Sequence, residues 1–87
     1  MLSAVLISAI WCSSCLIMRP RWQAFCLRHG ILFSEIDFDV DLDKVEQYHP
    51  GGVLPVMIFL TDGSETFRVI GEKREKEIER IFLERQG

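Results

Sequence analysis

The chain has 87 residues, of which 48% are hydrophobic and 26% charged, and its formal net charge is −3. This length predicts a single domain over residues 1–87, because domains usually span about 50 to 250 residues. The balance of apolar and charged residues excludes an intrinsically disordered chain and a fibrous repeat. Nucleic acid is not expected as a partner, because binding it requires a basic surface that this acidic chain lacks.

The first 18 residues form the longest uncharged segment, so we consider whether they are a transmembrane helix or a secretory signal. A transmembrane helix needs about 20 predominantly apolar residues, but serines and cysteines interrupt this segment before it ends at Arg19. A secretory signal begins with a positive charge, and none precedes Ala4. We therefore expect no membrane association and a cytoplasmic location, where closely spaced cysteines more often carry redox chemistry or bind metal than form structural disulfides.

The chain is predicted to begin with a strand and a long helix. Residues Ser3–Ile10 form a short run rich in Val, Ile and Leu, which is typical of a strand buried on both faces of a sheet. A helix is predicted over Ser13–His29 and should end at Gly30, which readily takes the left-handed conformation. Pro20 should kink this helix by removing one backbone hydrogen bond. Apolar residues recur at spacings of three and four and predict one buried stripe. The stripe consists of Cys15, Met18, Trp22, Phe25, Cys26 and His29.

A second strand is predicted over Ile31–Phe38, and an alternating pattern continues beyond it. Four apolar residues on alternate positions should face the core, namely Ile36, Phe38, Val40 and Leu42. The acidic residues between them are interpreted as a solvated face rather than a metal site. The three acids in the later part of this pattern are Asp39, Asp41 and Asp43.

Four further elements complete the prediction. They are a short helix Asp43–Tyr48, a strand Val56–Leu60, a strand Glu65–Ile70 and a helix Glu72–Arg85. Asp62-Gly63 joins the two strands as a hairpin turn. In the last helix, Ile78, Ile81 and Phe82 should form the apolar face and Glu72 should pair with Lys76. Strands separated by helices are expected to run parallel and the hairpin strands antiparallel, which gives a four-stranded mixed α/β sheet with helices on both faces.

The segment Trp11-Cys12-Ser13-Ser14-Cys15 stands where the first strand meets the first helix, and in this context a C-x-x-C pattern indicates redox chemistry. Cys12 should lie at the helix N-terminus, where unpaired backbone N–H groups and the helix dipole favour a thiolate. Cys15 follows by three residues, so the two thiols lie on one side of the helix within reach of a disulfide. Because Cys15 also begins the buried stripe, we expect Cys12 to attack and Cys15 to resolve.

Two other interpretations of these cysteines stay open. They form either an inert thiol pair or one half of a zinc site that His29 or His49 would complete. Redox chemistry is favoured because zinc normally needs a second closely spaced pair, and the two histidines lack metal-type spacing. Cys26 lies on the buried stripe and is interpreted as a small core residue.

Several motifs resemble those of the thioredoxin superfamily along nearly the whole chain. They are Trp11-Cys12-Ser13-Ser14-Cys15, Pro20, Asp37-Phe38-Asp39, Val53-Leu54-Pro55 and Val69-Ile70-Gly71. The resemblance implies a thioredoxin fold with a cis peptide bond before Pro55, beside the cysteines. It also implies that the Leu54 backbone pairs with substrate main chain and that Gly71 lets a substrate backbone approach. Trp11, next to Cys12, is expected to shape the docking surface.

The chain departs from the pattern of full-length thioredoxins in three respects. It begins at the central strand, so the N-terminal strand and helix of full-length thioredoxins are expected to be missing and the domain to be of glutaredoxin size. Leu6 stands where thioredoxins usually bury an aspartate that assists proton transfer at the second cysteine. Ser13-Ser14 matches neither the Gly-Pro of thioredoxins nor the Pro-Tyr of glutaredoxins.

The expected activity is thiol-disulfide exchange through a mixed disulfide on Cys12 that Cys15 resolves. No metal or organic cofactor is expected. The resemblance implies disulfide-containing proteins as substrates and a flavoprotein reductase or glutathione as electron donor. A glutaredoxin-like or isomerase-like exchange linked to glutathione stays open as an alternative, as does a non-catalytic binding module with the same fold.

Overall fold

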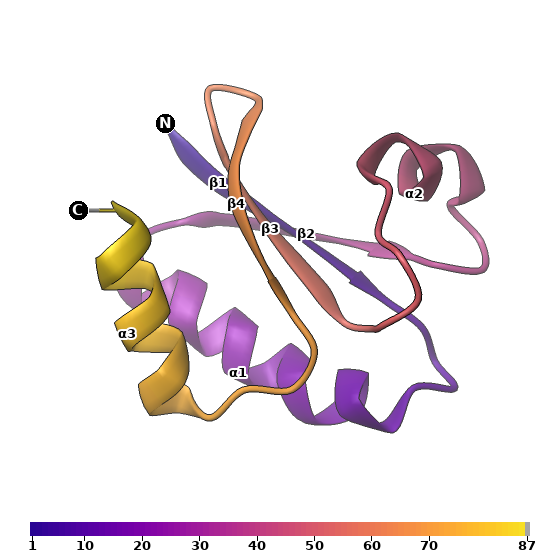
Figure 1. Cartoon of the computed structure of the whole chain (residues 1–87), viewed down its shortest axis with the longest axis horizontal. Helices are drawn as coiled ribbons and strands as arrows, with labels where there is room; N and C mark the ends of the chain where they lie inside the picture. The colour runs from indigo at the N-terminus through magenta and orange to yellow at the C-terminus, as the bar shows by residue number, and fades with distance from the viewer. Residues whose placement is uncertain (87) are drawn as a thin grey trace.

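The computed structural model describes residues 1–86 and contains a four-stranded sheet with helices on both faces (Figure 1). The elements are β1 (Leu2–Ser8), α1 (Ser13–His29), β2 (Leu32–Asp37), α2 (Leu42–Tyr48), β3 (Val56–Thr61), β4 (Ser64–Ile70) and α3 (Glu75–Gln86). The strand order is β2-β1-β3-β4, with β1 parallel to β2, and with β3 antiparallel to both β1 and β4. The predicted fold class, a mixed four-stranded sheet of the thioredoxin type, is therefore confirmed.

The direction of β3 corrects one expectation, because a helix separates it from β2 and yet the two strands run in opposite directions. A helix between two strands makes them parallel only where the connection returns along the length of the sheet. Asp37, the last residue of β2, pairs with Ser8. Val56, the first residue of β3, pairs with Ile7. The connection that contains α2 therefore stays at one end of the sheet, and the chain enters β3 at the same end at which it leaves β2. This is the end that also carries the start of α1.

The central strand β1 is buried on both faces, which explains its uninterrupted apolar sequence. Ala4 and Leu6 face the cluster beneath α1 and α3, whereas Val5 and Ile7 face the cluster beneath α2. Figure 1 shows the same division, with α1 and α3 together on one side of the sheet and α2 on the other. Within residues 1–86, the helices are too short or too polar to cross a membrane.

Helix α1 begins and ends at the predicted residues and runs through Pro20 without interruption. Gly30 follows it with φ 66° and donates its N–H to the carbonyls of Cys26 and Leu27. Five members of the predicted stripe are buried. The prediction was wrong for His29, which lies at the edge of the stripe. Its ring packs 4.4 Å from that of Phe25, while its Nε2 atom lies 3.1 Å from the Glu79 carboxylate at the surface.

The alternating pattern after Ile36 does not form one buried face. Strand β2 ends at Asp37, because the Oδ1 atom of Asp37 accepts the backbone N–H groups of Asp39 (2.8 Å) and Val40 (3.1 Å) and turns the chain. Val40 is consequently 76% exposed and Leu42 62% exposed. A sequence period of two indicates a strand only while the backbone stays extended. Here the hydrogen bonds to the Asp37 side chain end the extended conformation.

The C-terminal half follows the prediction except at the start of α3. Asp62 and Gly63 have φ values of 52° and 86°, as a two-residue hairpin turn requires. Helix α3 begins at Glu75, three residues later than predicted, because Glu77 Oε1 accepts the backbone N–H of Arg74 at 3.1 Å and caps the helix there. Glu72 therefore lies before the helix, so the predicted pairing of Glu72 with Lys76 was wrong.

Candidate dithiol site

The two cysteines of the motif lie at the start of α1 and belong to one helical turn. Cys12 is the N-cap, with extended backbone angles (φ −92°, ψ 113°) that let the chain leave β1 and enter the helix. Its sulfur accepts the backbone N–H of Cys15 at 3.3 Å, and its carbonyl accepts the N–H of Leu16 at 3.3 Å. Both cysteines are free thiols. The sulfur of Cys12 thus occupies the position of an N-cap acceptor, where partial positive charge favours an anion.

The two thiols differ in exposure, and the pKa of the buried one is raised. Cys12 is 9% exposed, whereas Cys15 is fully buried. Burial and, after it, a hydrogen bond with Cys12 raise the pKa of Cys15 to about 11. A hydrogen bond with the Ala9 backbone and the positive charge of Arg19 act in the opposite direction. The expected ranking, with Cys12 the more accessible thiol, agrees with these exposures.

The segment before β3 lies against the first cysteine. The Cys12 thiol donates to the carbonyl oxygen of Leu54 at 3.8 Å, and the Leu54 side chain packs on the cluster formed by Ala9, Cys12 and Cys15. The Leu54-Pro55 peptide bond is cis, as the resemblance implies, and Pro55 is fully buried.

Gly71 comes to the same place from the end of β4. Its N–H donates to the carbonyl of Pro55 at 2.8 Å, and its φ of 84° lies in the left-handed region that favours glycine. A Cβ at this position would lie 3.7 Å from Val53 Cγ1. The fold therefore brings Leu54, Pro55 and Gly71, three of the predicted substrate-binding residues, into one continuous strip next to Cys12.

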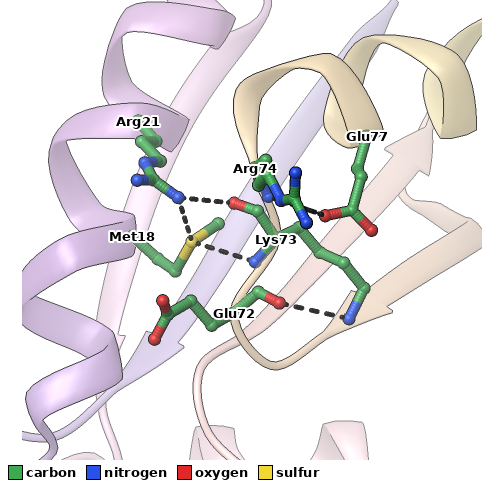
Figure 2. A network of polar contacts seen from close by, with 6 residues as sticks. All are labelled: Met18, Arg21, Glu72, Lys73, Arg74 and Glu77. Atoms are coloured by element: carbon green, nitrogen blue, oxygen red, sulfur yellow. Dashed lines mark hydrogen bonds and ion pairs between the residues drawn. The ribbon is translucent and has the colours of Figure 1, made fainter.

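A network of polar contacts holds the segment after Gly71 against α1 (Figure 2). Arg21 Nη1 donates to the Lys73 carbonyl at 2.8 Å, and the Lys73 N–H donates to the sulfur of Met18 at 3.4 Å. The Glu72 carboxylate accepts the Ser14 hydroxyl at 3.2 Å, which connects this segment to the turn between the two cysteines. The position of Gly71 relative to the dithiol is thus fixed by its hydrogen bond to Pro55 and by the contacts of the following residues with α1.

Trp11, the fourth predicted substrate-binding residue, lies on the surface beside the thiols and is 65% exposed. Its indole N–H donates to Asp39 Oδ2 at 2.6 Å, and its ring meets that of Phe38 edge-on at 6.4 Å. Asp39 was predicted only as a solvated acid, so its contact with Trp11 was missed. The contact depends on the turn after β2, and no local sequence signal reveals it.

A second group that sequence reasoning missed surrounds Arg19. Arg19 Nε donates to Glu35 Oε2 at 2.8 Å, and the Ser8 hydroxyl donates to the same oxygen. These residues line a cavity of about 270 Å³ together with Asp37 and Asp41. They come from α1, β1, β2 and the loop before α2, so only the assembled sheet brings them together.

The remaining candidates lie elsewhere. Among residues 1–86, no three His, Cys, Asp or Glu side chains are grouped closely enough to hold a metal ion. His29 contacts Glu79 at the far end of α1, and His49 ends α2 with φ 49°. Cys26 is buried in the core beneath α1, and burial raises the pKa of its thiol to about 12.

Comparison with known proteins agrees with the geometry. The family model for thioredoxin matches residues 2–84. Thioredoxin H7 of Arabidopsis thaliana is 29% identical over 75 residues, which are 85% of this chain and 57% of that protein. The thioredoxin of Gallus gallus is 31% identical over 70 residues, which are 79% of this chain and 66% of that protein.

A solved structure gives the same result in three dimensions. The thioredoxin NaTrxh of Nicotiana alata has a TM-score of 0.82 at 29% identity, over 97% of this chain and 72% of that one. The chain spans little more than half the length of two plant relatives that it matches, 57% of Thioredoxin H7 and 56% of the H-type thioredoxin of Oryza sativa. By sequence and by fold, the chain belongs to the thioredoxin family.

Proposed function

We propose that the chain is a thiol-disulfide oxidoreductase that uses Cys12 and Cys15 as a dithiol-disulfide couple. The observation that carries this proposal is the pairing of an N-cap thiol with a buried thiol in the same helical turn, beside the carbonyl of Leu54. Membership of the thioredoxin family supports the same class of chemistry.

The proposed reaction consists of two exchanges. The Cys12 thiolate attacks one sulfur of a substrate disulfide, and a Cys12-substrate disulfide forms while the other substrate sulfur leaves as a thiolate. Cys15 then gives up its proton and attacks the Cys12 sulfur, which releases the second substrate thiolate. Two electrons have passed to the substrate, and the chain holds a Cys12-Cys15 disulfide. The N-cap position supports the first exchange, because helix N–H groups stabilise a thiolate there.

The strip next to Cys12 supports substrate binding by backbone contacts. Leu54 precedes a buried proline that leaves its backbone beside the thiol, and Gly71 adds a backbone segment without a side chain. We propose that an extended substrate segment lies along Leu54, Pro55 and Gly71, with Trp11 covering the other side of Cys12. The proposed substrates are disulfide-containing proteins, with a flavoprotein reductase or glutathione as electron donor in a reducing, cytoplasmic compartment.

Trapping variants test the assignment of the two cysteines. Cys15→Ser should accumulate mixed disulfides with a protein substrate such as insulin, because the first exchange proceeds and the second does not. Cys12→Ser should form none, and both variants should lose at least about 99% of the insulin-reducing rate. If the unmodified chain reduces insulin no faster than either single variant, the catalytic role of the cysteines fails and the non-catalytic binding module is the better description. A reduction potential of the couple measured against glutathione then distinguishes a reductant from a glutathione-linked or isomerase-like enzyme.

A further inference from the structure

A positively charged side chain lies one helical turn beyond the buried thiol of the couple. Arg19 follows Cys15 by four residues on α1, and helical side chains tilt toward the N-terminus, so the Arg19 side chain extends over the turn that carries Cys15. Its guanidinium does not extend freely into solvent. The Nε atom donates to Glu35 Oε2 at 2.8 Å, and the Arg19 side chain is 34% exposed.

Glu35 reaches Arg19 because of the register of the sheet. It pairs with Leu6 across the parallel strands β1 and β2, so both side chains lie on the face that α1 covers. The Leu6 side chain is an uncharged hydrocarbon, so Glu35 is the charged member of this cross-strand pair. The Ser8 hydroxyl, two residues further along β1, donates to the same carboxylate oxygen as Arg19 and holds the carboxylate in place.

The carboxylates near the Arg19–Glu35 pair differ in what they bind. Of the five residues that line the cavity, Arg19 is the cation and Glu35 its direct partner. Asp37 Oδ1 accepts backbone N–H groups of the following turn, and Asp41 Oδ2 accepts the backbone N–H of Asp37. These two carboxylates are therefore engaged by the backbone, and Glu35 is the carboxylate that holds the Arg19 guanidinium one helical turn from Cys15.

We propose that Arg19 is the positioning residue of the resolving step, in which its guanidinium, held by Glu35, stabilises the negative charge that Cys15 acquires as it attacks the mixed disulfide on Cys12. The assignment rests on the proposed function. Cys15 loses its proton to solvent, its sulfur bonds to the Cys12 sulfur, and the substrate thiolate leaves with the electron pair of the broken bond. Burial is the main cause that raises the pKa of Cys15 to about 11, and the charge of Arg19 acts in the opposite direction.

The first measurement is a titration that does not depend on activity. In a chain carrying Cys12→Ser and Cys26→Ala, Cys15 is the remaining thiol, and the ¹³C chemical shift of its labelled Cβ reports its ionisation. Arg19→Met should raise the pKa of Cys15 by about half a unit or more, because a nearby opposite charge is removed. Arg19→Lys keeps the positive charge and should therefore leave the pKa of Cys15 close to that in the chain with Arg19. Arg28→Met breaks a matched ion pair to Glu79 (2.7 Å) at the other end of α1 and should leave the titration unchanged.

The second measurement follows the two exchanges separately with the aromatic disulfide reagent 5,5′-dithiobis(2-nitrobenzoate). Attack by Cys12 releases the first coloured thiolate, and resolution by Cys15 releases the second. At pH 7, Arg19→Met should slow the second phase about threefold and leave the first unchanged, since half a pKa unit changes the thiolate fraction by about that factor. Arg19→Gln serves as a second neutral variant if Arg19→Met does not fold.

The outcomes separate the two proposals. If the unmodified chain shows both phases and the Arg19 variants behave like Arg28→Met in titration and in kinetics, the role of Arg19 is overturned while the oxidoreductase stands. If the unmodified chain shows no second phase, the proposed function fails, and the resolving role of Arg19 fails with it. A slowed second phase in Arg19→Met that Arg19→Lys repairs supports both.

Discussion

Cys26 shares a helix face with Cys15, but its surroundings assign it to the core. It packs beneath α1 with Trp22 and Phe25, and burial raises its pKa to about 12, so it stays a neutral thiol at physiological pH. A buried neutral thiol is a weak nucleophile and a good small apolar residue. The helical spacing of cysteines therefore does not by itself identify a third redox thiol.

Replacing this thiol should change stability and leave the chemistry intact. Cys26→Ala should keep the insulin-reducing rate within experimental error and lower the free energy of unfolding by about 1 kcal/mol, since it removes one buried heavy atom from a packed core. The rate and a urea unfolding curve measure the two effects. Rapid alkylation of Cys26 in the folded Cys12→Ser chain at pH 7 would contradict this assignment.

The predicted and the unpredicted parts of the site differ in how far apart their residues lie in the sequence. The roles proposed for Cys12 and Cys15 follow from their positions at the start of one helix, so a few adjacent residues suffice to suggest them. The contact of Trp11 with Asp39 spans 28 positions and that of Arg19 with Glu35 spans 16. Such contacts depend on strand register and on the turn after β2, which composition and periodicity do not specify.

At the scale of the elements, α1 shows how local signals determine a helix. Its start at Ser13, directly after Cys12, and its end at a left-handed glycine were both predicted, because each depends on one residue and its immediate neighbours. The start of α3 was predicted three residues early, because the charged segment before it looks equally helical. There the side chain of Glu77, which accepts the Arg74 N–H, decides where the helix begins.

Gly30 provides a test of the helix end. Gly30→Ala should destabilise the fold by about 1 kcal/mol, because an alanine at φ 66° meets the strain of the left-handed conformation. A Cβ there would have no neighbour within 4 Å, so backbone strain is isolated from packing. Gly52→Ala is the matched control, since its Cβ also enters open space and its φ lies outside the left-handed region. Equal urea midpoints for the two variants would contradict the argument.

At the scale of the whole molecule, the two faces of the sheet carry different cores. The face beneath α1 and α3 is rich in aromatic side chains, with Phe25 and Phe82 in edge contact at 5.0 Å and Phe59 stacked on Phe67 at 4.6 Å. The opposite face is aliphatic and is covered by the short helix α2. The aromatic core is therefore closed by α3, and α3 is attached to α1 by polar contacts at its edge.

Glu79 makes that attachment and should make stability depend on pH. A hydrogen bond from Arg28 lowers the pKa of Glu79 below its ordinary 4.5, and His29 adds to this effect. Because the folded pKa lies below the unfolded one, the stabilisation is complete above pH 4.5 and is lost as the pH falls through the folded value. Glu79→Gln should weaken the acid dependence of the unfolding free energy between about pH 5 and pH 3. Glu84→Gln is the control, since its 3.9 Å contact with Arg80 stays within α3. Identical pH profiles for Glu79→Gln and the unmodified chain would show that the attachment of α3 does not depend on this charge.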